Sequence, residues 1–350
     1  MTRKVRLSDI AERLNLTKVS VSKALRDHPD ISKDTRELVK KTAAEMGYSP
    51  NLLARSLSSQ QSLTLGVVVP KIAHTFFASA IDAIQSEATG AGYGIVLAVS
   101  NENAELERRH IERLLAMRVD GLLVSTSQQK PDLDIYERVR TMGVPLVFFD
   151  RRIEEVPFSS VTVDDYGGAY EAVEYLVRQG CRAIAHIAGT PDVAIGRRRR
   201  EGYEAALRAH GIERRAPWVI EGGFDEWHGY RAFQAMLRDG GPLPEAVLAV
   251  SFPVGLGVHA AMLEHDPALQ DRVRIVAFGE GGLNEWYTYP HTCVRQPTRA
   301  IGQEAVRLLL EHINGTGGAP PRHVVLPTEL LTPETYPRPF QPDEPPHRTD

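Results

Sequence analysis

The sequence predicts an all-α helix-turn-helix head followed by an α/β body of two lobes, each built on a parallel sheet. Residues 7–47 contain three short helical patterns separated by turn and capping residues, and from residue 63 onward short apolar runs alternate with helical patterns. The chain has 350 residues, 42% of them hydrophobic, which is enough for two or three domains with substantial cores.

The head starts with two helices joined by a tight turn. Ile10 and Leu14 share one helical face, and Asn15 follows where the turn needs a residue tolerant of left-handed φ. Thr17 can cap the second helix, which runs to Leu25. A third helix, capped by Ser32 and running to Met46 before Gly47, closes a three-helix core.

The second helix exposes cations, small hydroxyls and one apolar side chain near its N-terminus: Lys18, Val19, Ser20, Ser22 and Lys23. These groups suit phosphates, base edges and thymine methyls, so the helix can enter a major groove of double-stranded DNA. The alternative is that the lysines only keep a surface solvated. We therefore expect DNA as the partner of the head.

The residues after the third helix can form a further short helix. Pro50 blocks continuation of the helix, Asn51 can cap a new one, and Leu53, Ala54 and Leu57 share its face. Such a short helix is unstable alone in water, so we expect it to order only against a partner and on DNA.

Taken together, the runs LSDIA at 7–11, VSKAL at 21–25 and GYSPNLLARSL at 47–57 resemble the lactose/galactose-repressor family of bacterial transcription regulators. The resemblance continues through residues 66–70, 119–123, 150–151, 202–203 and 294–297, and covers about residues 5 to 331. It implies a periplasmic-binding-protein-like body that binds a small-molecule effector. It also implies that Asn51, Ala54 and Leu57 contact DNA, with Leu57 wedged into the minor groove. The alternative for Leu57 is packing against its mate in a dimer.

Charge is distributed unevenly along the chain. Residues 1–62 carry twelve Lys/Arg and seven Asp/Glu, a net charge of +5, so the remainder carries 29 against 38, or -9, within the total of -4. A basic head on an acidic body fits a head that approaches phosphate, with an affinity for DNA that falls steeply with salt.

The composition argues against several other classes of protein. No stretch approaches the roughly 18 to 20 apolar residues of a membrane span, and no apolar run follows the charged N-terminus, so we expect a cytoplasmic protein without a membrane partner. Cys181 and Cys293 lie far apart without metal-ligand spacing, so we expect two buried or half-buried thiols, no metal and no cofactor.

The alternation of apolar runs and helical patterns in the body predicts two sets of βαβ units. Strands are expected at 65–69, 94–99, 121–124, 146–149, 161–163, 184–187, 219–221, 246–250 and 273–278. The resemblance implies three crossings between the lobes. The expected domains are therefore a head (1–50), a hinge helix and linker (51–62), an N-terminal lobe (63–163 and 294–322), a C-terminal lobe (164–293 and 323–340) and a disordered tail (341–350).

Ligands of such sheets bind beyond the carboxyl ends of the strands, here between the lobes. The resemblance places the following residues in that cleft: Pro70, His74, Phe76, Phe77, Ser125, Asp150, Arg199, Phe224, Ser251, Phe252 and Gly279. A guanidinium such as that of Arg199 can hold a carboxylate or two hydroxyls through parallel bonds. The alternatives are a solvated helix face for residues 197–200 and core positions for the three phenylalanines 76, 77 and 224.

Three positions depart from the family pattern. Ser251 and Gly279 stand where relatives often clamp sugar hydroxyls, and Ile195 stands where a small hydroxyl residue is usual. Together with Phe252 and Trp286, they favour apolar surface on the ligand, because each unmatched polar group costs about 1 to 3 kcal/mol on burial. We expect the effector to be a modified or larger sugar, or a non-sugar metabolite, rather than a simple hexose.

A two-fold symmetric, palindromic operator requires a homodimer, and residues 333–350 contain no leucine heptad that would join two dimers. The competing classes are an enzyme and a transporter's solute-binding protein. The sequence has no GxxxxGK[ST], GxSxG or HExxH motif, and it has a head but no secretion signal. A repressor controlled by an effector, as inducer or corepressor, is the function that the sequence favours.

Overall fold

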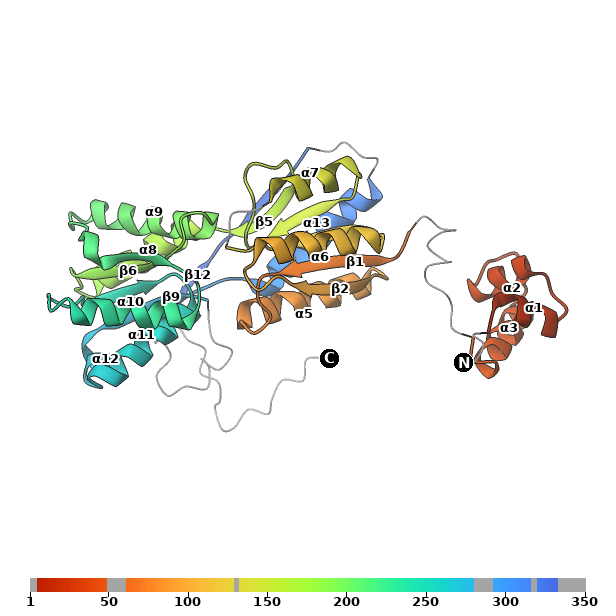
Figure 1. The fold of residues 1–350 in the computed structure, drawn as a ribbon, viewed down its shortest axis with the longest axis horizontal. Coiled ribbons are helices and arrows are strands. Elements are labelled where there is room, and N and C mark those ends of the chain that lie inside the picture. Colours follow the sequence, from red (N-terminus) through yellow and green to blue (C-terminus); the bar gives the residue numbers. More distant parts are fainter. Residues whose placement is uncertain (1–4, 49–60, 129–131, 280–291, 316–319, 333–350) are drawn as a thin grey trace. The chain divides into compact units, whose positions relative to one another are not determined.

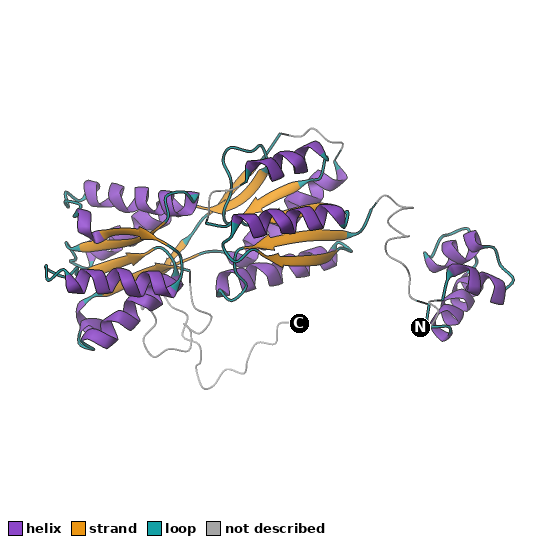
Figure 2. Ribbon diagram, viewed as in Figure 1, coloured by secondary structure: helices purple, strands orange, loops and turns teal. Residues whose placement is uncertain are grey.

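The protein is described by a computed structural model, which covers residues 5–48, 61–128, 132–279, 292–315 and 320–332 (Figure 1). The chain divides into two compact units, residues 1–62 and residues 63–350. The first is entirely helical where it is described, and the second combines helices with two sheets (Figure 2).

The head is the predicted three-helix domain, with α1 (Leu7–Arg13), α2 (Lys18–Leu25) and α3 (Lys33–Glu45). Its core is built on Ile10, Ala11, Val21, Ala24, Val39 and Ala43. Asn15 has a φ of 52°, which confirms the predicted left-handed turn residue, and Gly47 has a φ of 68° where the third helix was expected to end. The Thr17 hydroxyl accepts from the Ser20 amide at 3.0 Å, which confirms the cap of α2.

The first lobe contains a parallel sheet in the order β11-β5-β4-β3-β1-β2. Its strands are β1 (Thr64–Val69), β2 (Gly94–Val99), β3 (Gly121–Val124), β4 (Leu146–Phe149), β5 (Ser159–Val163) and β11 (His323–Leu326). Helices α5 (Thr75–Gly90) and α13 (Thr298–Asn314) cover one face, and α6 (Ala104–Ala116) and α7 (Leu133–Thr141) cover the other (Figure 1). Val67 and Val68 point to opposite cores, as a strand covered on both faces requires.

The second lobe repeats the plan in the order β12-β10-β9-β8-β6-β7, with β12 antiparallel to β10. Its strands are β6 (Ile184–Gly189), β7 (Val219–Gly222), β8 (Ala246–Ala249), β9 (Arg274–Phe278), β10 (Cys293–Arg295) and β12 (Glu329–Leu331). Helices α8 (Asp165–Arg178) and α9 (Ala194–Ala209) cover one face, and α10 (Glu226–Arg238) and α11 (Phe252–His265) cover the other; α12 is Leu269–Arg272.

The chain crosses between the sheets three times, but two crossings come later than the expected boundaries at 293/294 and 322/323. Strand β10 pairs with β9 in the second sheet, so the second crossing follows Arg295. Strand β11 pairs with β5 in the first sheet, and β12 pairs with β10, so the third crossing lies between Leu326 and Glu329. His323–Leu326 therefore belongs to the first lobe and corrects our assignment of 323–340 to the second.

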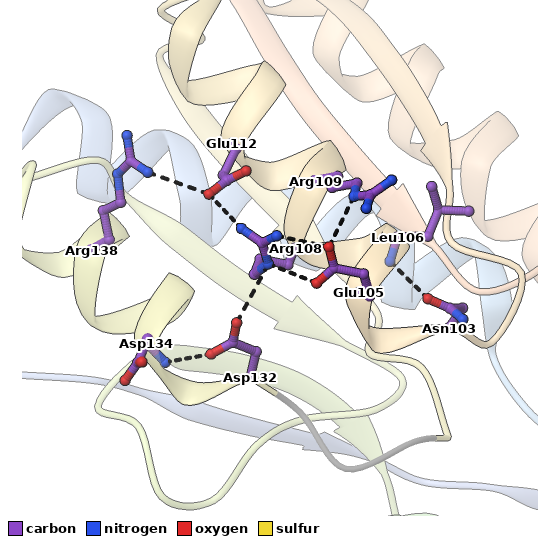
Figure 3. Close-up of polar contacts among 9 residues, drawn as sticks. All are labelled: Asn103, Glu105, Leu106, Arg108, Arg109, Glu112, Asp132, Asp134 and Arg138. Carbon is purple, nitrogen blue, oxygen red and sulfur yellow. Dashed lines mark hydrogen bonds and ion pairs between the residues drawn. The ribbon is translucent and has the colours of Figure 1, made fainter.

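An exposed network of ion pairs joins α6 to α7 in the first lobe (Figure 3). The Arg108 guanidinium lies 2.7 Å from both Glu105 and Glu112, and Glu112 also faces Arg138 of α7 at 3.4 Å. Hydrogen bonds from Arg108 and Arg109 lower the pKa of Glu105 to about 2. These charges lie at a partly exposed surface, so we assign them a role in positioning α7 rather than in ligand binding.

Gly202 allows α9 to pack closely on α8, and we expect Gly202→Ala to destabilise the body. A Cβ at residue 202 would lie 2.2 Å from the backbone oxygen of Tyr166. Such overpacking should lower the free energy of unfolding by about 1 to 3 kcal/mol, measured by urea denaturation. Gly90→Ala is the matched control, because no atom lies within 4 Å of its Cβ, and it should raise stability by up to about 1 kcal/mol. Equal effects of the two substitutions would contradict the packing explanation.

Candidate functional site

The outward face of α2 is the candidate DNA-binding surface of the head. Val19 is 66% exposed and Lys18 is also exposed. Ser20 bonds to Thr17, Ser22 accepts from Arg26 at 3.1 Å, and Lys23 pairs with Asp30 at 2.7 Å. Lys18 and Val19 are thus exposed to an approaching DNA, whereas Lys23 would have to leave its ion pair with Asp30 to bind a phosphate. Asn51, Ala54 and Leu57 lie outside the described residues.

A cavity of about 130 Å³ lies between the two lobes. The first lobe contributes His74, Thr75, Phe76, Phe77, Ser79, Asp150, Arg151 and Thr298, and the second contributes Ile195, Arg199, Phe224, Ser251, Phe252, Pro253, Phe278, Gly279 and Gln296. All the predicted effector residues are brought together here except Pro70 and Ser125. Pro70 is buried at the end of β1. Ser125 donates to Asp150 at 3.3 Å, so it acts on the cavity through that carboxylate.

Turns that follow parallel strands hold most of these side chains. His74 is the N-cap residue of α5, after β1, and Ser251 is the N-cap residue of α11, after β8. The Ser251 hydroxyl donates to the Phe224 carbonyl at 2.9 Å, which ties two loops of the second lobe together. The lining comes from the carboxyl ends of both sheets because parallel strands all end at one edge.

Arg199 is buried and already holds three protein contacts. Its Nε and Nη2 lie 2.8 and 2.7 Å from Asp165 Oδ1, its Nη1 donates to the Val250 carbonyl at 2.5 Å, and its guanidinium stacks over Phe278 at 3.8 Å. The edge that we expected to grip a ligand through two parallel bonds is thus occupied by Asp165. These contacts use one N–H of Nη1 and one of Nη2, so each terminal nitrogen of Arg199 has a second N–H beyond them.

Asp150 combines a strained backbone with an unfavourable charge. Its φ is +62°, and its side chain is 7% exposed. Burial raises the pKa of Asp150 to about 6, against the opposing effect of Arg151 and Arg199. A buried carboxylate in a left-handed conformation destabilises the fold, which is typical of a residue that serves binding.

Arg151 is the main lining residue that our sequence analysis missed as a site. It is buried, its Nη1 donates to Glu102 at 2.8 Å, and its guanidinium lies over Phe224 of the other lobe at 4.6 Å. The only signal in the sequence was its place in the matched pair 150–151. An arginine beside an expected ligand residue reads equally well as a solvated side chain.

Apolar rings occupy much of the remaining wall. Phe76 and Phe77 pack edge to face at 5.1 Å, with Phe224, Phe252 and Phe278 opposite them across the cavity lining. Burial lowers the pKa of His74, so its imidazole is neutral at pH 7. A cavity of about 150 Å³ accommodates a ring as small as benzene, so the present space suits a small ring.

Two family models match the chain. Residues 62–334 match periplasmic binding proteins and the sugar binding domain of the LacI family, and residues 6–51 match the bacterial regulatory proteins of the lacI family. The chain belongs to the lacI family of bacterial regulatory proteins. The expected family and fold class are confirmed.

Individual relatives agree with this assignment. The lacI-family chain is 30% identical to the HTH-type transcriptional repressor CytR of Escherichia coli K12 over 88% of this chain and 90% of that protein. It is 28% identical to catabolite control protein A of Priestia megaterium, over 89% and 93%. A crystal structure of the lac repressor dimer bound to operator and the anti-inducer ONPF matches with a TM-score of 0.82 and 27% identity, over 94% and 98%. This lacI-family member is thus a transcriptional regulator with a DNA-binding head and an effector-binding body.

Within the ranges given above, no three His, Cys, Asp or Glu side chains are grouped to hold a metal ion. None of the helices in those ranges is long and apolar enough to cross a bilayer. Cys181 and Cys293 are both buried and are not joined in a disulfide, as predicted.

Proposed function

We propose that the protein is a homodimeric repressor that binds a palindromic operator through α2 of each head and responds to a small molecule bound between its lobes. The observation that carries this proposal is the pairing of a capped α2 that exposes Lys18 and Val19 with a separate body whose cavity draws its lining from both lobes. Ligand-dependent movement of the lobes would change how two heads are presented to DNA, with a coupling of about 1 to 3 kcal/mol.

The proposed effector is a compact molecule with an apolar face and a small number of hydroxyls. Phe76, Phe224 and Ile195 offer apolar surface, whereas Asp150 accepts hydrogen bonds. The ligands of similar regulators are candidate effectors. One similar solved structure is a complex of the transcriptional regulator CelR with cellobiose. Isothermal titration calorimetry with glucose, galactose and ribose tests the class, and tight binding of any of these plain sugars would overturn the exclusion of simple sugars.

Operator binding by α2 is tested with Lys18→Ala. If Lys18 contacts a phosphate, the substitution should weaken binding of a promoter fragment and reduce the slope of log K against log salt by about 1. Fluorescence anisotropy at several salt concentrations measures both. Lys41→Ala, an exposed lysine on α3, is the matched control and should leave the slope unchanged. Identical slopes for Lys18→Ala and the parent would remove Lys18 from the interface.

The hinge is tested with Leu57→Ser. If Leu57 is a minor-groove wedge, a polar replacement should abolish preference for a palindromic fragment over random DNA and leave the salt-dependent background. Retained preference would mean that Leu57 only packs against its mate.

We further propose that the protein acts by binding rather than by catalysis, and that it does so in the cytoplasm, where operator DNA lies. Its relatives are transcriptional regulators. Chemical conversion of a ligand by the protein, detected by chromatography of the incubated mixture, would contradict this.

A further inference from the structure

An ion pair joins the two lobes outside the ligand cavity. Arg197 Nη2, on α9 of the second lobe, lies 2.7 Å from Glu154 Oε2, in the loop after β4 of the first lobe. The Arg197 guanidinium also donates to the Pro191 carbonyl at 3.3 Å, which fixes it on its own lobe. Neither Arg197 nor Glu154 lines the cavity of about 130 Å³, so the pair can hold the lobes together without binding a ligand there.

On the first lobe, a series of contacts leads from Glu154 to the edge of the sheet. Arg152 Nη2 donates to Glu154 Oε1 at 3.1 Å, and Arg152 Nη1 lies 3.2 Å from His323 Nδ1. His323 is the first residue of β11, and its Nδ1 also lies 2.9 Å from the Ser160 hydroxyl of β5. Glu154 is thus held from two sides, by Arg152 in its own lobe and by Arg197 in the other.

The contact with Arg152 requires a neutral imidazole at His323. A guanidinium can only donate, so His323 Nδ1 must accept from Arg152, and the ring proton lies on Nε2. A proton on Nδ1 would remove that acceptor and place a positive charge against Arg152. Burial and the charge of Arg152 accordingly lower the pKa of His323. The neighbouring cation on the same strand, Arg322, is paired with Glu311 of α13.

We propose that Glu154 and Arg197 form a clasp between the lobes, which is closed while His323 is neutral and opens when His323 gains a proton. The closed clasp keeps Arg152 against His323, and an open clasp frees Arg152. The closed form therefore binds fewer protons at His323 than the open form, so a fall in pH favours opening. This inference rests on the lobe movement in the proposed function and adds a pH-dependent control of that movement.

The size of the effect follows from the exposure of the clasp. The side chains of Arg197 and Glu154 are 39% and 41% exposed, so solvent weakens their attraction. We expect loss of the pair to change the ratio of closed to open chains by about 1.4- to 5-fold.

Double electron–electron resonance measures the separation of the lobes, with spin labels on Asp134→Cys of α7 and Arg208→Cys of α9. Both positions are exposed, whereas the native Cys181 and Cys293 are buried. Labelled chains are diluted with unlabelled ones, so that each measured pair lies within one chain. The parent should shift toward longer distances between pH 8 and about pH 5.5, and Arg197→Met should show the longer distances already at pH 8. Identical distances in Arg197→Met and the parent at pH 8 would overturn the clasp.

Two matched variants separate the clasp from a general effect of charge. Arg198→Met is the control for Arg197→Met, because Arg198 is also exposed on α9 but pairs with Glu201 of the same helix. It should keep the distances and the pH dependence of the parent. His323→Asn retains an acceptor for Arg152 but cannot be protonated, so it should stay closed at both pH values. A pH-dependent shift that persists in His323→Asn would overturn the role of His323.

The reciprocal effect provides a second measurement. An open clasp frees Arg152, so NMR titration of the His323 ring should give a higher pKa in Arg197→Met than in the parent. Equal pKa values in the two proteins would overturn the coupling between His323 and the clasp. Operator binding by the same preparations reports separately on the proposed repressor function, because the distances between the lobes are measured without DNA or ligand.

Discussion

Replacing Asp150 with asparagine should make the body more stable at pH 8 by about 2 to 3 kcal/mol. The pKa of this carboxyl is about 6 in the folded chain against 3.8 for the free side chain, so folding disfavours the charged form. The native stability is therefore fully present below pH 3.8 and falls as the pH rises through 6. Asparagine carries no charge at any of these pH values and tolerates the φ of +62° well, so its gain over the parent grows as the pH rises from 3.8 to about 6 and is complete above that.

Urea denaturation of parent and variant at pH 5 and pH 8 measures this effect. The difference between them should be larger at pH 8, while Asp82→Asn, at an exposed position on α5, should show little difference at either pH. The same Asp150→Asn variant should bind a hydroxylated effector at least about tenfold more weakly, because a charged acceptor is lost. An equal gain at both pH values would assign the effect to the backbone instead of the charge.

Arg199→Met should destabilise the body by about 3 to 5 kcal/mol, since it leaves a charge buried without its partner. Asp165 is buried like Arg199, and burial raises the pKa of Asp165 even with the guanidinium 2.7 Å away. Removing the cation leaves that carboxylate to be neutralised or exposed. Thermal and urea unfolding both measure the loss.

Two further variants isolate the pair. Arg199→Met with Asp165→Asn removes both charges and should recover much of the stability, because a buried neutral pair avoids the desolvation of ions. Arg198→Met is the neighbouring control; Arg198 is largely exposed, with Glu201 at 3.3 Å, and its loss should have little effect. If the double variant were no more stable than Arg199→Met alone, the buried pair would not explain the loss.

The order of elements could be predicted from the sequence because strands buried on both faces are continuous apolar runs. The starts of three helices of the body could not. In the sequence the apolar helical pattern is visible only from Phe77, Arg197 and Leu256, whereas α5, α9 and α11 start at Thr75, Ala194 and Phe252. The first turns of these helices line the cavity between the lobes, so their side chains do not follow the apolar pattern of a core-facing helix.

Most residues that line the cavity could be predicted from the family pattern, but the carboxylates that pair with its two arginines could not. Asp165 is 34 positions from Arg199 in the chain, and Glu102 is 49 from Arg151. Only the packing of α8 on α9, and of the loop after β2 beside the loop after β4, brings these charges together. The sheet to which β11 belongs could not be predicted either, because its short apolar run suits the edge of either sheet.

The three crossings of the chain bear on how the protein is made on the ribosome. Strand β5 is synthesised early, but α13, which shares one face of the same sheet with α5, follows about 140 residues later, and the edge partner β11 follows about 160 residues later. At roughly 5 to 20 residues per second, the first lobe stays incomplete for roughly 8 to 30 seconds, with a bare strand edge and an uncovered apolar face. Neither lobe can finish folding before the last strands emerge, so the nascent body needs protection from aggregation until synthesis is nearly complete.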